Sequence, residues 1–153
     1  AMQEAVPKGE GGMIAVLGSE LKILEDIINK KKNEFRCFIA NDNSNGQIVL
    51  SGTMNNIEKL SIYLNSLNIK NIKLSVSAPF HCELMKTATE LMRNELAKVV
   101  FKDFRTALIS NVTAQEIDDN LLIRDLLIRQ IESRVRWRES INYMIKNGVK
   151  NFI

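Results

Sequence analysis

The sequence predicts an α/β fold, and two observations lead to this prediction. Up to residue 77, short runs with the period of two that is typical of strands alternate with longer runs whose apolar residues recur every three or four positions, as in helices. After Pro79 the helical pattern dominates and strand-like runs are few. We therefore expect a first part over residues 11–77, a second part over residues 78–153, and a lead-in over residues 1–10.

The first part begins with a strand-like apolar run over residues 13–17, which ends at Gly18. Ser19 offers an N-cap for a helix whose buried face carries Leu21, Leu24 and Ile28. The elements predicted next are a strand over 35–40, a cluster of turn formers over 41–46, a strand over 47–51, a helix over 57–67 and a strand over 72–76. The pair Asn45-Gly46 suits a hairpin between the two middle strands. The resulting order β-α-β-β-α-β is that of a ferredoxin-like subdomain, an arrangement that serves many unrelated functions.

The second part has a long amphipathic helix over residues 84–96 and a strand-like run over 107–110. A helix over 121–132 follows a capping cluster at 118–120, and another over 136–146 is closed by Gly148. This alternation suggests one edge of a larger α/β body. Residues 151–153 resemble a strand cut short and residue 1 is not methionine, so we expect a segment of a longer protein.

Composition excludes several classes of function. The chain of 153 residues has 21 basic and 18 acidic side chains and a formal charge of +3, and its only lysine run, at 30–32, fits a solvated helix end, so no nucleic acid partner is expected. Cys37 and Cys82 form no Cys-x-x-Cys motif and the histidine is single, so neither a disulfide framework nor a metal site is indicated, and a reducing cytoplasm fits. No apolar run approaches the roughly 18 residues of a membrane span, and the start has no signal-peptide pattern.

His81 is the first candidate for chemistry. A single histidine is more often structural than catalytic, but this one follows Pro79 at the junction of a predicted strand and helix, and the polar Ser75 and Ser77 precede it. A histidine suits general-base catalysis, provided that a nucleophile lies within hydrogen-bonding reach. The chain has no Gly-x-Ser-x-Gly motif, so the nucleophile of such a base would lie outside these residues.

The loop over 41–47 is the second candidate. Its amides could face a polar ligand, although a simple polar turn is the commoner explanation of such a cluster.

Several motifs together resemble the malonyl-CoA:acyl-carrier-protein transacylases of bacterial type II fatty acid synthesis. The motifs are, in order, residues 2–7 with 9–13, residues 41–52, residues 75–85, residues 111–114, and Arg129-Gln130 with residues 135–140. The resemblance covers nearly the whole chain, and the order and spacing of the motifs make it more specific than any one motif.

This resemblance implies a ferredoxin-like subdomain joined to part of an α/β-hydrolase-like acyltransferase body. It implies a malonyltransferase that moves malonyl from coenzyme A to the phosphopantetheine thiol of acyl carrier protein through a seryl ester. His81 matches the family's catalytic histidine, and the backbone carbonyl of Gln130 matches the group that orients it. Asn41 and Asn43 match positions near the bound substrate, and Phe80 weakly supports a choice of malonyl. Malonyl-CoA and acyl carrier protein are the implied partners; the resemblance implies no cofactor, and we expect a monomer for the intact polypeptide.

The chain also departs from the family pattern. The nucleophile elbow, the groups of the oxyanion hole and the arginine that pairs with the malonyl carboxylate have no match here, nor does the Glu-Ile-Gly-x-Gly stretch expected after residue 153. We therefore expect this segment to carry the base without the nucleophile and to be inactive alone, because loss of a nucleophile costs orders of magnitude in rate.

Two alternatives stay open from the sequence. One is a ferredoxin-like binding module for RNA or a small ligand, although residues 35–39 lack the aromatic pattern of an RNA-recognition sheet. The other is a relative that has lost its serine.

Overall fold

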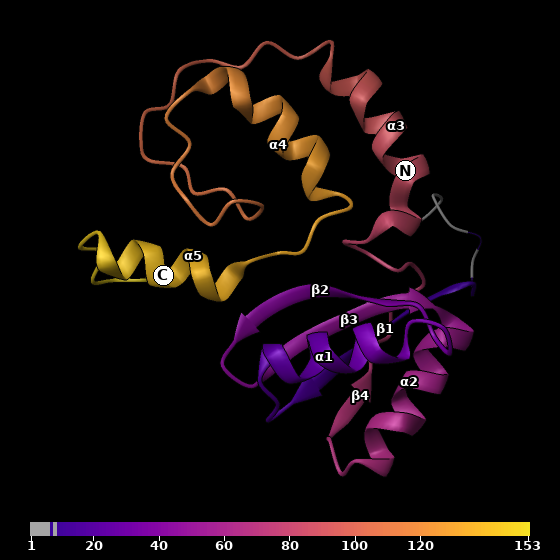
Figure 1. Ribbon diagram of the computed structural model, residues 1–153. Helices are drawn as coiled ribbons and strands as arrows, with labels where there is room; N and C mark the ends of the chain where they lie inside the picture. Colours follow the sequence, from indigo (N-terminus) through magenta and orange to yellow (C-terminus); the bar gives the residue numbers. More distant parts are fainter. Residues whose placement is uncertain (1–6, 8) are drawn as a thin grey trace.

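The computed structural model describes residue 7 and residues 9–153. Most of the predicted lead-in, together with part of the first motif, lies outside these described residues. Figure 1 shows a sheet with helices packed on one face and further helices beside it. The elements of the first part are β1 Gly11–Leu17, α1 Leu21–Lys31, β2 Cys37–Ser44, β3 Gln47–Thr53, α2 Met54–Ser66 and β4 Asn71–Lys73.

The sheet has the order β2-β3-β1-β4, and every neighbouring pair is antiparallel. The predicted hairpin is confirmed, since β2 and β3 are joined by Asn45 and Gly46, and Gly46 has a φ of 87° that favours glycine. The turn formers at 41–44 were wrongly assigned to the loop. They continue β2 because their backbone pairs with β3 through two register shifts.

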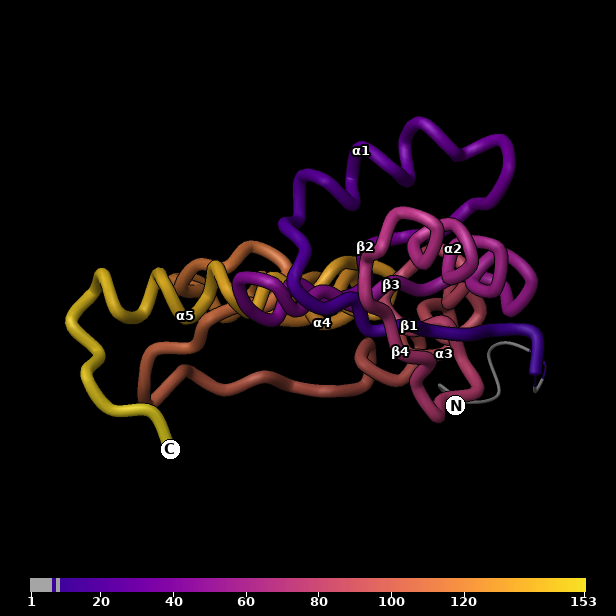
Figure 2. Tube along the Cα trace, turned by 90° about the horizontal axis from the view of Figure 1, so that it is seen from below, coloured from indigo at the N-terminus to yellow at the C-terminus, as the bar shows by residue number. Residues whose placement is uncertain are grey.

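Both faces of the sheet are covered. Ile14 and Val16 point toward the helices and pack with Leu24 of α1 and Leu60 of α2, and Figures 1 and 2 show both helices on the same face. The alternate side chains of β1 face the other way, where Met13 packs with Ala40, Val49 and partly buried residues that include Phe80. This second cluster places the segment before His81 against the face of the sheet opposite to α1 and α2.

The second part consists of η2 Glu83–Met85, α3 Lys86–Leu96, η3 Asn120–Leu122, α4 Ile123–Gln130 and α5 Trp137–Lys146. Within it, α3 packs on α4, while α5 lies beside β2 (Figure 1). Asp119 caps the 3-10 turn η3 that leads into α4, since its Oδ1 accepts a hydrogen bond of 2.8 Å from the Leu121 amide, whereas the N-cap residue of α4 itself, Leu122, makes no side-chain capping bond. The predicted end of the last helix is confirmed, because Gly148, which follows the C-cap Asn147 of α5, has a φ of 91°.

Four further details of the sequence prediction are wrong. Residues 107–110 form only one bridge, Ile109 to Glu116, and residues 151–153 form no strand, because neither run has a full strand to pair with among the described residues. Ser19 does not cap α1; the capping position is Glu20, whose side chain makes no capping bond. The strand predicted over 72–76 is shorter, since only residues 71–73 pair with β1.

No helix in the described part of the chain is both long and apolar enough to cross a membrane.

Candidate functional site

His81 lies where the chain turns from the sheet into the second part. Pro79 is buried, His81 is half-buried, and η2 begins two residues later at Glu83. The backbone of His81 is left-handed, with a φ of 60°, a conformation that most L-residues avoid. This turn directs the chain into α3 and leaves the imidazole facing the end of α4.

The imidazole is oriented by a backbone group. His81 Nδ1 lies 3.0 Å from the carbonyl oxygen of Gln130, the last residue of α4. Since a carbonyl oxygen can only accept, Nδ1 must carry the hydrogen, and Nε2 of the neutral ring then has a free lone pair. This is the contact that the sequence resemblance implies. The Gln130 side chain makes a separate, long contact, in which its Oε1 accepts from Asn111 Nδ2 at 3.4 Å.

A cavity of about 480 Å³ has His81 in its wall. It lies between α1, the start of β2 and the loop after α4, and its lining includes Glu25, Phe38, Cys82, Glu132 and Arg134. The wall therefore combines charged and apolar groups. Such a mixture suits a polar ligand with an aliphatic portion.

Cys37 and Cys82 also line this cavity, and both are buried free thiols. Burial raises the pKa of Cys37 to about 12, and burial also raises the pKa of Cys82. A thiol with a raised pKa is a poor nucleophile at neutral pH. Neither cysteine is therefore a candidate to replace a serine.

The two asparagines lie apart from the His81 cavity. Asn43 lines a separate cavity of about 590 Å³ with Trp137 and Arg138 of α5. Asn41 lines none of the described cavities and instead forms a parallel bridge with Val135. The structure thus brings His81 and Gln130 together, and the Val135 bridge connects Asn41 to the segment that follows α4.

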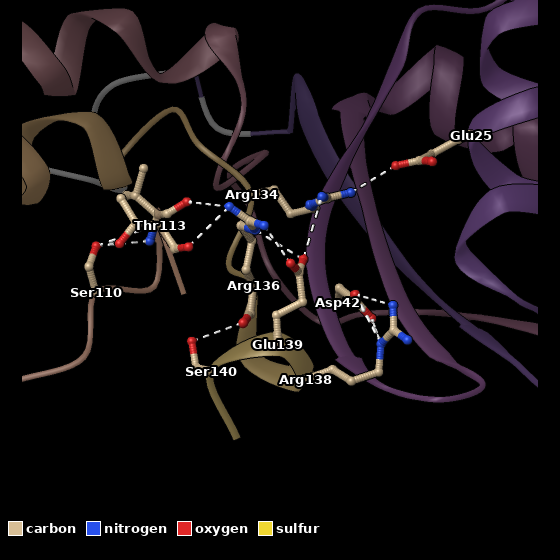
Figure 3. Close-up of polar contacts among 10 residues, drawn as sticks. Glu25, Asp42, Ser110, Thr113, Arg134, Arg136, Arg138, Glu139 and Ser140 are labelled. Atoms are coloured by element: carbon tan, nitrogen blue, oxygen red, sulfur yellow. Dashed lines mark hydrogen bonds and ion pairs between the residues drawn. The ribbon is translucent and has the colours of Figure 1, made fainter. Parts of the chain in front are cut away.

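Sequence reasoning missed Asp42, which lies between the two asparagines. Its side chain is 0% exposed and accepts hydrogen bonds from Arg138, with Nε at 2.9 and 3.1 Å and Nη2 at 2.7 Å (Figure 3). The bond raises the pKa of the Arg138 guanidinium. An aspartate within a run of asparagines resembles another turn former, so the local sequence gave no signal of this pair.

Comparison with known proteins confirms the resemblance found in the sequence. No family model matches the chain. The malonyl CoA-acyl carrier protein transacylase of Bacillus subtilis is 42% identical over 99% of this chain and 49% of its own length. The crystal structure of the Clostridium perfringens transacylase superposes with a TM-score of 0.90 at 39% identity, covering 97% of this chain and 47% of that one.

A third match is a malonyl-transacylase solved in complex with a type II PKS acyl-carrier protein. It has a TM-score of 0.90 and 30% identity, and the match covers 97% of this chain and 48% of that one. The chain therefore spans about half the length of the relatives that it matches. These similarities do not favour the alternative of a ferredoxin-like binding module.

Proposed function

We propose that this chain supplies the base-carrying, C-terminal portion of a malonyl-CoA:acyl-carrier-protein transacylase of fatty acid biosynthesis. The observation on which this rests is the pair formed by His81 and the Gln130 carbonyl, 3.0 Å apart, within a chain that is similar to such transacylases over 99% of its length. The nucleophilic serine would come from the portion that these 153 residues do not match.

His81 is the general base in this proposal. Nε2 accepts the proton of the serine hydroxyl while the serine oxygen attacks the malonyl thioester, and the resulting imidazolium returns that proton to the coenzyme A sulfur as the carbon–sulfur bond breaks. The same steps run in reverse order with the phosphopantetheine thiol of acyl carrier protein, which takes the malonyl group from the serine. The Gln130 carbonyl holds the ring in the tautomer that leaves Nε2 free, without adding a negative charge.

The proposal includes the division of the chain into a ferredoxin-like subdomain and part of an acyltransferase body. The element order β1-α1-β2-β3-α2-β4 and the strand order β2-β3-β1-β4 support a ferredoxin-like subdomain over residues 11–77. Residues 78–153 would then form part of an α/β-hydrolase-like body. In this arrangement Asn41 and Asn43 contribute to the subdomain wall of the substrate cleft. The two free cysteines agree with a cytoplasmic location.

A chimera tests the proposal. These 153 residues replace the matching half of the Bacillus subtilis relative, and the intact mass is measured after incubation with malonyl-CoA. We expect a gain of one malonyl group and its transfer to acyl carrier protein, whereas the 153-residue chain alone should gain nothing. A chimera that unfolds cooperatively, as the parent relative does, yet takes up no malonyl group would overturn the proposal.

The chimera also tests how Gln130 acts. Gln130→Ala keeps the backbone carbonyl and removes only the long contact to Asn111, so we expect kcat to fall less than about threefold, as for a substitution that disturbs no essential contact. A fall of kcat by two orders of magnitude would mean that the side chain of Gln130, and not only its carbonyl, is required at this position.

A further inference from the structure

The loop after α4 is attached to the sheet by backbone hydrogen bonds. The amide of Val135 donates to the carbonyl of Ala40 at 2.8 Å, and the amide of Asp42 donates to the carbonyl of Val135 at 2.9 Å. Together these bonds place Val135 beside Asn41 as a single parallel bridge at the free edge of β2. One bridge is a weak attachment, because a strand pair gains stability from several consecutive bonds.

Ion pairs reinforce this attachment on both sides of the bridge. Three arginines alternate along the segment, at 134, 136 and 138. Arg134 reaches Glu25 of α1 at 2.8 Å, and Arg138 binds Asp42 of β2 (Figure 3). Arg136 stays within the second part, where its guanidinium binds Glu139 and donates to the carbonyl of Thr113 at 3.2 Å. Two of the three therefore connect the second part to the sheet and its helix.

The pair of Asp42 and Arg138 differs from the others in its burial. Asp42 is 0% exposed and Arg138 is 35% exposed. A bidentate guanidinium–carboxylate contact fixes orientation as well as distance. Because water does not solvate a buried carboxylate, loss of the arginine would leave that charge without a partner. The three arginines are similarly exposed, but the carboxylates that Arg134 and Arg136 bind, Glu25 and Glu139, are 42% and 34% exposed.

The geometry points to Asp42 and Arg138 as positioning residues that set the asparagine-bearing strand in register with the His81 and Gln130 pair. Asp42 lies between Asn41 and Asn43, so it fixes that stretch of β2. Arg138 lies in the first turn of α5, and only six residues separate Gln130 from α5. The pair thus connects the strand that carries Asn41 and Asn43 to the helix that follows Gln130. The catalytic meaning of this inference rests on the proposed function; its structural content does not.

Asp42→Asn is the variant of choice. Removing the arginine would leave a buried carboxylate without a partner, which is severe, whereas Asp42→Asn leaves an arginine that can turn toward water. The double variant Asp42→Asn/Arg138→Gln removes both charges and should be no worse than the single one if the two residues act as a unit. Arg93→Gln is the matched control, because it breaks an exposed pair with Glu90 on α3.

Two measurements on the 153-residue chain do not depend on transacylase activity. His81 is the only histidine, so its ring ¹⁵N signals report its tautomer without assignment by mutation. Hydrogen exchange at the Val135 and Asp42 amides reports the bridge. We expect Asp42→Asn to move the ring signals away from the Nδ1–H form and to speed exchange at these two amides, with no change at amides of the β1–β3 ladder.

In the chimera, Asp42→Asn should lower kcat/KM by up to about 10²-fold, as for a misplacement of about 1 Å, while Arg93→Gln stays within about twofold. Unchanged ring signals and unchanged exchange at Val135 would overturn the inference. So would equal loss of protection across the whole sheet, which would mean a purely structural role. If Asp42→Asn does not fold, the His81 ring signals and the amide exchange are measured on the double variant instead, with the same expected result. An inactive chimera with the expected spectra would refute the proposed function and leave the positioning role standing.

Discussion

Gly11→Ala should displace the turn that carries His81. A Cβ at position 11 would lie 2.2 Å from Pro79 Cδ and 2.8 Å from Pro79 N, whereas carbon atoms in contact prefer about 3.5–4.0 Å. The proline ring is rigid, so Pro79 and β1 must separate by more than about 1 Å. Overpacking of this kind costs about 1–3 kcal/mol. Since Pro79 is two residues from His81, the shift should also break the 3.0 Å contact between Nδ1 and the Gln130 carbonyl.

The neighbouring glycine provides the control. A Cβ at position 12 would lie 3.2 Å from the flexible end of Met54 and 3.7 Å from Ile57 Cβ, which is an ordinary contact distance, so Gly12→Ala should cost less than about 1 kcal/mol. Urea unfolding gives the stability of both variants, and the ring ¹⁵N signals of His81 give the state of the contact. Equal midpoints for the two variants, with His81 signals like those of the unchanged chain, would refute the argument that Gly11 is required by its approach to Pro79.

Three further predictions concern stability. Burial raises the pKa of Cys37 to about 12 in the folded state, whereas an unfolded thiol has a pKa of about 8.5. Above about pH 8.5 the folded state therefore keeps a proton that the unfolded state loses, and the free energy of unfolding should fall by up to about 1.4 kcal/mol per pH unit. Urea titrations from pH 7 to 10 should show this slope, and Cys37→Ala should flatten it. The hydrogen bond from Arg136 lowers the pKa of Glu139; its stabilisation is therefore present above the usual glutamate pKa of about 4.3 and is lost as the pH falls through the lower folded value. The stability difference between the chain and Glu139→Gln should shrink below pH 4, and a constant difference would contradict this cause. Thr53 Oγ1 accepts from the Asn56 amide at 3.3 Å as the N-cap of α2, so Thr53→Ala should cost about 1 kcal/mol in thermal or urea unfolding and Thr53→Ser much less.

Much of the first part could be predicted from the sequence because its signals are local. The apolar run in β1, the helical spacing in α2 and the turn at Asn45 and Gly46 each depend on neighbouring residues. Residues 107–110 have the pattern of a strand but were wrongly predicted, since a strand also requires a partner, which a single-chain pattern does not reveal. A high strand propensity shows that a segment can pair in a sheet, but it does not show that a partner strand is present.

Some residues of the candidate site could also be proposed from the sequence, and others could not. His81 was identified by its setting after a proline, and the resemblance supplied Gln130. The pair of Asp42 and Arg138 joins residues 96 positions apart, and neither residue has a local pattern that announces the other. Only the packing of α5 beside β2 brings them together, so a contact of this type is inaccessible to reasoning from periodicity and motifs.

The left-handed backbone of His81, with its φ of 60°, decides which substitution removes the imidazole most cleanly. Histidine is one of the few residues other than glycine that are enriched in this region, together with asparagine and aspartate, so alanine would remove the imidazole and also a residue type that accepts this backbone conformation. Asparagine tolerates the region better than most residues. His81→Asn therefore isolates the loss of the ring, whereas His81→Ala mixes lost chemistry with a relaxing loop. At this residue the conventional knockout is the less clean experiment.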